Sequence, residues 1–174
     1  KLPFSARLIR ETHKTLMRGV RGRHKQPGEF RRSQNWIGGA TIDDASFVPP
    51  VHTSIDELIA DLERFVHDEQ RHFPELLKAA LVHYQFETIH PFVDGNGRTG
   101  RTLVHVILRR RGLAPSVVPP ISLVLATWAG AYVDGLTATR YRGEPASQAA
   151  VDGINDWLEL FAGATTRAVG DAAN

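Results

Sequence analysis

The stretch that decides the fold runs from His83 to Gly112 and reads HYQFETIHPFVDGNGRTGRTLVHVILRRRG. Pro91 disfavours the α conformation in the residue before it, so a helix that includes the first part of this stretch should end near His90. From Arg98 onward, apolar residues at 103, 104, 106, 107 and 108 follow helical spacing, and Gly112 is suited to end this second helix. The sequence therefore predicts a glycine-rich loop that leads into the N-terminus of a helix.

Length and hydrophobic periodicity favour one compact, all-α domain. The chain has 174 residues, 42% of them hydrophobic, which is enough for a single core. Ser54 and Glu57 form a capping-box pattern, and the segment 121–136 is apolar around most of its circumference, so it should be a largely buried helix. The expected helices cover residues 5–18, 54–71, 73–88, 98–112, 121–136 and 146–169.

One segment departs from helical spacing. Residues 34–51 contain the β-prone triplets NWI and SFV on either side of a region rich in glycine and aspartate. We expect a small β-hairpin here, although a plain surface loop is the alternative. Two strands alone are only marginally stable, so such a hairpin must lean on helices or stay mobile, and a mobile edge can accept an extended peptide.

Composition argues against several classes of protein. Because the chain has no cysteine, disulfides and thiolate sites are unavailable, which is typical of a reducing compartment such as the cytoplasm. No apolar run reaches the roughly 20 residues of a membrane helix, so we expect no membrane association. The net charge is only +2, and the basic runs at 18–25 and 109–111 lack interleaved aromatic residues, so nucleic acid is not expected as a partner. Because the chain begins with Lys1 instead of methionine, we interpret it as a fragment of a longer protein.

The glycine-rich loop combines residues that bind anions. Gly95 and Gly97 flank Asn96, and paired glycines let backbone amides turn towards an anion. The helix that starts here adds partial positive charge, and Arg98 and Arg101, three residues apart, can project over the same anion. This pattern predicts a polyphosphate site. It is not the GxxxxGK[ST] loop of many nucleotide-binding proteins, because no lysine follows the glycines at that spacing.

A carboxylate and a base accompany the predicted anion site. Asp94 is a suitable ligand for Mg²⁺, which takes one or two protein carboxylates and completes its shell with water and phosphate oxygens. Histidine side chains ordinarily titrate near neutral pH, so His90 is suited to take a proton from a hydroxyl group. Each residue alone has an ordinary interpretation, since a histidine before proline can cap a helix and GNG is often only a turn. Together they indicate nucleotide-dependent group transfer.

Residues 90–101 resemble the signature of the Fic family, H-P-F-x-[D/E]-G-N-G-R-x-x-R, because HPFVDGNGRTGR fills every specified position. The similarity extends from about Glu29 to Leu136, since GEFRRSQNWIGG, FVPPV and HYQFETIHPF also resemble segments of that family. The resemblance implies that residues 1–174 form a single Fic domain, a compact helical bundle with a hairpin flap at about 34–51. It also implies transfer of AMP from Mg²⁺-ATP to a Ser, Thr or Tyr hydroxyl of a target protein, or of the chain itself, with release of pyrophosphate.

The resemblance further implies roles for the signature residues. His90 would be the general base that deprotonates the target hydroxyl, and Asp94 would hold Mg²⁺ between the α- and β-phosphates. Phe92 would be a core anchor. The phosphate-binding groups would be the backbone amides of Gly95, Asn96 and Gly97, the side chain of Asn96, and the guanidinium groups of Arg98 and Arg101.

Two segments outside the signature also correspond to the family. The hairpin would lie beside the active site and register the target peptide by strand addition. Tyr132 resembles the first position of a tyrosine pair that contacts adenine, whereas Val133 departs from the second. Helical spacing from Trp128 indicates a core position for Tyr132 equally well. The flap candidates are Ile37, Gly38 and Gly39.

Other interpretations stay open. The chain can instead be a non-catalytic nucleotide-binding or interaction module that docks through its hairpin, and related proteins transfer UMP, phosphocholine or the terminal phosphate of ATP. Many family members carry an inhibitory helix with the pattern [S/T]-x-x-x-E-[G/N], whose glutamate pairs with the second signature arginine. This sequence lacks that pattern. The inhibitory segment is therefore expected upstream of Lys1 or on a separate protein, which leaves Arg101 without that partner.

Overall fold

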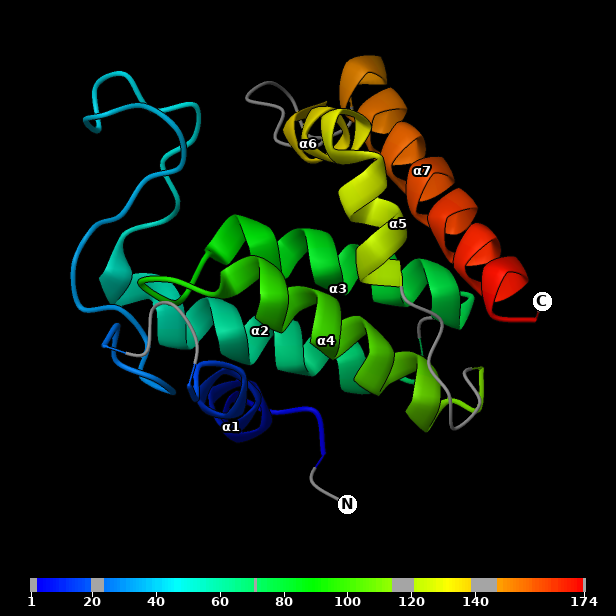
Figure 1. The fold of residues 1–174 in the computed structure, drawn as a ribbon, viewed down its shortest axis with the longest axis horizontal. Helices are drawn as coiled ribbons and strands as arrows, with labels where there is room; N and C mark the ends of the chain where they lie inside the picture. Colours follow the sequence, from blue (N-terminus) through cyan, green and yellow to red (C-terminus); the bar gives the residue numbers. More distant parts are fainter. Residues whose placement is uncertain (1–2, 20–23, 71, 114–120, 139–146, 174) are drawn as a thin grey trace. The chain divides into compact units, whose positions relative to one another are not determined.

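Helices make up most of the computed structural model, which describes residues 3–19, 24–70, 72–113, 121–138 and 147–173 (Figure 1). The all-α prediction is confirmed, since the described residues contain no named β-strand. The elements are α1 (Ala6–Leu16), the short 3₁₀ helix η1 (His52–Ser54), α2 (Ile55–His67), α3 (Glu75–Ile89), α4 (Asn96–Arg110), α5 (Ile121–Thr127), α6 (Ala129–Ala138) and α7 (Gln148–Ala173).

The chain divides into two compact units. The first contains Lys1–His72 and Gln85–Leu103, and the second contains Phe73–Tyr84 and Val104–Asn174. Both α3 and α4 contribute residues to each unit. The signature loop, residues 90–101, belongs entirely to the first unit. That residues 1–174 form a single domain stays a prediction.

The first unit packs α1 against α2. Ser5 caps α1, because its hydroxyl accepts the N–H of Leu8 at 3.3 Å. Near their ends the two helices are joined by a bond from the Ala6 amide to the Glu63 carboxylate, 3.3 Å long. The core of this unit is formed by Phe4, Ile9, Met17, Ile55, Ile59, Leu62, Val66, Phe86, Ile89, Phe92 and Leu103.

The predicted capping box at the start of α2 is wrong. Ser54 precedes the helix, but its side chain makes no capping hydrogen bond. The reason is local geometry, because η1 brings the chain into α2 with Ser54 already in the helical region, at φ −91 and ψ −3. A capping side chain reaches the amides of the first turn from an extended residue instead.

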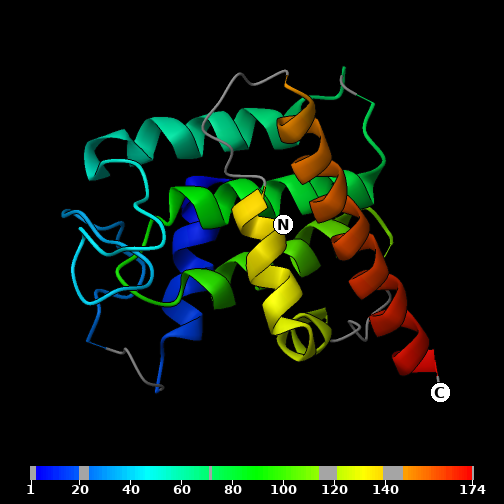
Figure 2. The same cartoon turned by 90° about the horizontal axis from the view of Figure 1, so that it is seen from above.

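In the second unit, α7 lies alongside α5 and α6 (Figure 2). Gly135 permits the close approach of α6 to α7, because a Cβ there would lie 3.2 Å from both Trp157 and Leu160. Trp157 is fully buried, and its indole N–H donates to the Ala80 carbonyl of α3 at 3.0 Å. The apolar core of this unit contains Ala79, Ala80, Val82, Val104, Ile107, Leu108, Ile121, Val124, Leu125, Leu136, Ala150, Trp157, Phe161, Ala164 and Ala168.

The single buried helix predicted for residues 121–136 is also wrong. The segment forms two helices, α5 and α6, that meet at an angle of 92° around Trp128. Its outer side chains are exposed, with Leu123 at 64% and Val133 at 58%. Apolar residues continue through the bend, so hydrophobic periodicity does not reveal it. Gly130, two residues after Trp128, lowers the cost of leaving the helical path.

Within the described residues, no helix taken singly has the length and apolarity to cross a membrane, and α5 and α6 meet that test only as a bent pair.

The segment 34–51 pairs as predicted, but over one residue pair only. Ile37 and Phe47 form an antiparallel bridge, with N–H to carbonyl distances of 2.9 and 3.1 Å. The ladder cannot continue after Ile37, because the next two residues are glycines with φ of +71. On its other side, Pro49 and Pro50 follow Phe47 at a distance of two and three residues and have no N–H to donate. We call this segment the flap.

The end of α4 confirms the role predicted for Gly112. Its φ is +75, its N–H bonds the Arg109 carbonyl at 3.2 Å, and the N–H of Leu113 bonds the Leu108 carbonyl at 2.9 Å. These two bonds are the pattern of a Schellman cap, which requires a left-handed residue at this position.

We expect Gly112→Ala to lower the free energy of unfolding by about 1 kcal/mol, because alanine is strained at positive φ. Nothing lies within 4 Å of the added methyl group, so the effect would come from the backbone alone. Gly163→Ala, in the interior of α7, is the control and should raise stability by about 0.5–1 kcal/mol. Urea unfolding measures the change in free energy for both variants. If the two changes had the same sign, the assignment of Gly112 as a left-handed cap would be contradicted.

Candidate functional site

His90 stands at the point where α3 stops. Its amide makes the last helical bond, to the Phe86 carbonyl at 3.0 Å, and its φ of 48 then turns the chain out of the helix. Pro91 excludes the ordinary helical conformation here, so the residue adopts the left-handed one, which histidine tolerates better than most side chains. The sequence predicted this helix end correctly. A histidine in a sparsely populated conformation is also a feature that functional sites often show.

The imidazole of His90 is oriented through its Nδ1 atom. This atom lies 3.3 Å from the Glu87 carbonyl, to which only an N–H can donate, and 3.9 Å from the Glu87 carboxylate. The Glu87 side chain is 8% exposed and that of His90 is 19% exposed. With the hydrogen on Nδ1, the lone pair of the neutral ring is on Nε2. His90 is therefore arranged to take a proton at Nε2.

The start of α4 offers a set of backbone donors. Gly95 has a φ of +81, and its carbonyl accepts both the amide of Thr99 at 3.0 Å and the Thr99 hydroxyl at 2.9 Å. The amides of Asn96, Gly97 and Arg98 are in the first turn of α4, where no helix carbonyl is placed to accept their hydrogen atoms. These donors and the helix dipole together favour a negatively charged group.

The two signature arginines lie against this first turn. The Arg101 guanidinium folds back over Gly97, where its Nη1 atom is 3.0 Å from the position that a Cβ would occupy. The Arg98 Nη2 atom lies 3.8 Å from the Asp94 carboxylate and 3.2 Å from the Met17 sulfur. Both charges are therefore next to the amides that would hold an anion.

Asp94 lies just before the first turn of α4. Its carboxylate accepts the Gly95 amide at 2.7 Å, and its side chain is 45% exposed. No group of three His, Cys, Asp or Glu side chains suited to a metal occurs in the part of the chain that the structure describes. One accessible carboxylate beside an anion site fits Mg²⁺ bound jointly with phosphates, because this ion takes few protein ligands in such sites.

The Asn96 side chain bonds the backbone of Phe92. Its oxygen accepts the Phe92 amide at 2.9 Å, and its nitrogen donates to the Phe92 carbonyl at 2.8 Å. The residue is 2% exposed. Both polar atoms thus close the signature loop on itself. The phosphate contact predicted for this side chain stays a prediction.

Two residues that bond the backbone of the signature loop were missed by sequence reasoning. Arg31 is 3% exposed and donates from its side chain to the carbonyls of His90, Ser33 and Pro50, while its amide donates to the Pro91 carbonyl at 2.8 Å. It thus joins the base of the flap to the residue before Pro91. The second is His13, buried in α1 with its Nε2 atom 2.9 Å from the Asp94 carbonyl. Its one sequence signal was its position on the apolar face of α1, four residues from Ile9 and from Met17.

The flap candidates lie at the turn that follows the bridge. Gly38 and Gly39 both have a positive φ. A Cβ at Gly38 would lie 2.4 Å from the Ser46 hydroxyl, and a Cβ at Gly39 would lie 2.5 Å from the Asp44 carbonyl. The flap also touches the signature loop, because the Asn35 side chain donates to the Phe92 carbonyl at 3.2 Å. Ile37, Gly38 and Gly39 as peptide-docking residues stay a prediction.

Tyr132 belongs to the second unit. Its hydroxyl lies 3.0 Å from His83 Nε2, and its ring packs 6.0 Å from that of Trp157. These contacts agree with the core interpretation. The adenine contact assigned to this residue stays a prediction.

A model of the Fic/DOC family matches residues 3–108, which include the whole signature loop. The chain belongs to the Fic/DOC family. Among curated relatives, the protein adenylyltransferase Fic of Drosophila grimshawi is 36% identical over 123 residues, which cover 68% of this chain and 23% of that protein. This Fic chain therefore spans less than a quarter of the length of the curated relatives it matches.

Solved structures of Fic proteins share the fold. A Fic family protein from Desulfovibrio desulfuricans superposes with a TM-score of 0.68 at 26% identity, over 97% of this chain and 48% of that one. A Fic domain containing signalling protein from Bacteroides thetaiotaomicron gives a TM-score of 0.65 at 22% identity, over 97% of this chain and 64% of the other. The second likeness shows the fold alone.

We expect Arg31→Lys to lower the free energy of unfolding by about 2–4 kcal/mol, because the compact ammonium group of lysine cannot reach the three separate carbonyls that the planar guanidinium reaches, and it leaves buried acceptors unpaired. Arg32→Lys is the matched control, since the neighbouring arginine is exposed and should change stability by less than about 0.5 kcal/mol. Chemical denaturation compares the two. Similar small losses in both variants would show that the carbonyl contacts of Arg31 contribute little.

The tip of the flap should loosen in acid. Hydrogen bonds from the Thr41 hydroxyl and from the Ala40 and Thr41 amides lower the pKa of Asp44 to about 2, from its ordinary value of 3.8. Because the folded value is the lower one, these bonds contribute fully above pH 3.8 and are lost as pH falls towards 2. The protection factors of the Ala40 and Thr41 amides, measured by hydrogen exchange, should therefore rise as the pH is raised from about 2 to 3.8. Asp44→Asn should abolish that dependence, whereas Asp43→Asn should leave it.

Proposed function

We propose that this Fic domain transfers AMP from ATP to a hydroxyl side chain of a target protein, in the presence of Mg²⁺, and releases pyrophosphate. The observation that carries the proposal is the placement of a histidine base and a helix N-terminus with two arginines in one twelve-residue loop. The relatives named as protein adenylyltransferases support it, although they share only this portion of their length.

The first step is the positioning of the nucleotide. The amides of Asn96 and Gly97 would bind phosphate oxygens, and Arg98 and Arg101 would neutralise the β- and γ-phosphates. Asp94 would hold Mg²⁺, which would supply positive charge beside the phosphates and stabilise the leaving pyrophosphate. Phosphoryl-type transfer depends mainly on such positioning and charge neutralisation.

The second step is proton transfer. The target hydroxyl would lie within reach of His90 Nε2 and lose its proton to this atom while its oxygen attacks the α-phosphorus. The bond between the α-phosphorus and the bridging oxygen breaks, and pyrophosphate leaves with the electron pair. The bond from Nδ1 to the Glu87 carbonyl would hold the ring in the tautomer that this step requires.

The third requirement is an accessible target residue. One antiparallel bridge, between Ile37 and Phe47, is present in the flap, and an extended peptide would add to the edge of this short pairing. Exposed apolar side chains on the flap, at Trp36, Ile42 and Val48, would contact the side chains of that peptide.

The proposal is tested with ATP labelled at either the α- or the γ-phosphate, incubated with the chain and a cell lysate. We expect label in protein only from the α-position, and a loss of roughly 10²–10⁴-fold in rate for His90→Ala. His72→Ala, an exposed histidine in the same chain, is the matched control and should retain the rate.

Other outcomes would replace the proposal. Label from the γ-position alone would indicate terminal phosphate transfer, and transfer only from labelled UTP or CDP-choline would change the donor. No transfer from any of these compounds would indicate a non-catalytic binding module.

A further inference from the structure

A histidine with no exposed surface lies behind the signature loop. His13 of α1 is 0% exposed, its Nδ1 atom lies 2.8 Å from the Gly28 amide, and its Nε2 atom lies 2.9 Å from the Asp94 carbonyl. An amide can only donate, so Nδ1 is the acceptor and the ring hydrogen is on Nε2, from which it is donated to Asp94. The neutral ring therefore satisfies both neighbours. Burial is the largest influence on the pKa of His13 and lowers it, which favours this neutral form.

The same ring supports the loop through contacts at two further residues. It stacks on Phe92 with the ring centres 3.7 Å apart and the planes within 4° of parallel. At Gly95 a Cβ would lie 3.3 Å from His13 Nε2 and 2.8 Å from the Met17 sulfur. Only glycine therefore allows α1 to approach this closely. The backbone on both sides of the Asp94–Gly95 peptide thus rests against one helix.

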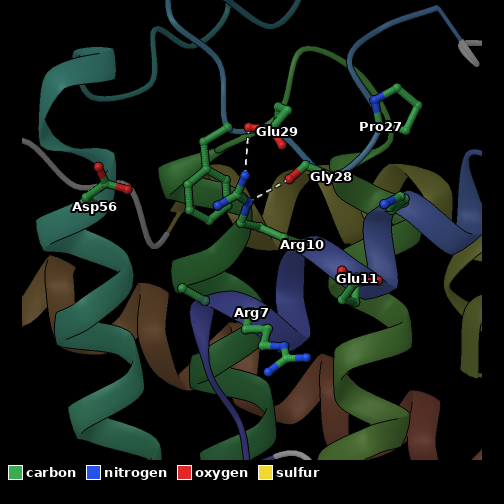
Figure 3. A pocket seen from close by; sticks show the side chains of 10 residues that line it. Arg7, Arg10, Glu11, Pro27, Gly28, Glu29 and Asp56 are labelled. Carbon is green, nitrogen blue, oxygen red and sulfur yellow. Dashed lines mark hydrogen bonds and ion pairs between the residues drawn. The ribbon is translucent and has the colours of Figure 1, made fainter.

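His13 is itself held from the other side. The Gly28 carbonyl accepts Nε of Arg10 at 2.7 Å, and the same guanidinium pairs with Glu29 at 2.7 Å (Figure 3). Gly28 lines a cavity of about 380 Å³ between α1, α2 and the 27–30 segment. A continuous path of hydrogen bonds therefore runs from the wall of this cavity, through Gly28 and His13, to the Asp94 carbonyl.

We propose that His13 is a positioning residue of the transfer reaction, acting through the bond from its Nε2–H to the carbonyl of Asp94. The Asp94–Gly95 peptide joins the proposed Mg²⁺ ligand to the first turn of α4, and its N–H bonds the Asp94 carboxylate at 2.7 Å. The orientation of this peptide therefore sets the position of that carboxylate relative to the amides of Asn96 and Gly97. The inference rests on the proposed function. It predicts that loss of this one bond weakens Mg²⁺-nucleotide binding by more than the loss of folding stability explains.

Two substitutions separate the two nitrogen atoms of the ring. His13→Gln places an amide near the position of Nε2, so it can still donate to Asp94, and loses the acceptor for Gly28. His13→Asn places an oxygen near Nδ1, so it can still accept from Gly28, and loses the donor to Asp94. Both variants lose the stacking on Phe92. Leu62→Ala, a core change in α2, is the control for a purely structural loss of stability.

The readouts are KM for ATP, kcat, and calorimetric binding of Mg²⁺-ATP, at a temperature where thermal unfolding shows every variant to be folded. We expect His13→Asn to raise KM and the dissociation constant roughly tenfold or more, with a smaller change in kcat, whereas His13→Gln should stay within about threefold. Leu62→Ala should change neither constant. The positioning role of His13 would be overturned if His13→Asn and His13→Gln changed KM and the dissociation constant equally. It would also be overturned if these changes simply followed the fall in melting temperature.

A measurement without nucleotide keeps this inference separate from the proposed function. Hydrogen exchange over residues 94–97 should accelerate in His13→Asn and remain close to that of the unsubstituted chain in His13→Gln. If the unsubstituted chain binds no Mg²⁺-ATP, the proposed function and the role of His13 both fail. If it binds and transfers while the Asn variant equals it in binding and in exchange, only the role of His13 fails.

Discussion

The paired hydrogen bonds between the Asn96 side chain and the Phe92 backbone are the constraint on which the site depends. They join two residues four apart and force the intervening chain into a closed loop that ends at the first turn of α4. Phe92 is fully buried and Asn96 almost so, which means that neither bond competes with water. The positive φ of Gly95 lets the chain pass from this loop into the helix.

Buried and half-buried polar side chains from elsewhere in the first unit converge on the same loop. His13 holds the Asp94 carbonyl, Arg31 holds the carbonyl of His90, and Asn35 adds a second donor to the carbonyl of Phe92. A buried polar group is costly unless it is bonded, so these contacts select one loop conformation over alternatives that would leave a donor unpaired. An active site built on preorganised backbone amides requires this kind of support, because small displacements weaken electrostatic stabilisation.

The arrangement also separates the chemical tasks. The proposed base is at the end of one helix and the proposed anion site at the beginning of the next, and four residues from Pro91 to Asp94 lie between His90 and Gly95. Glu87 orients the imidazole through its backbone carbonyl, whereas the arginines lie on the first turn of α4. Arg31 bonds the carbonyls of Pro50 in the flap and of His90, and Asn35 of the flap bonds the Phe92 carbonyl. These bonds link the segment proposed to dock the target to the loop proposed to hold the nucleotide.

The sequence alone determined the features that depend on near neighbours. Helical periodicity, the effect of Pro91 on His90 and the left-handed cap at Gly112 are local, and the spacing within HPFVDGNGRTGR places a base, a carboxylate and two arginines around one helix start. Tertiary structure decided the rest. The bonds of His13 and Arg31 to the loop join residues 81 and 59 positions apart, which no local pattern reports. The sharp bend at Trp128 and the inward use of the Asn96 side chain were likewise decided by packing, because the same residues are compatible with a straight helix and with an outward-facing amide.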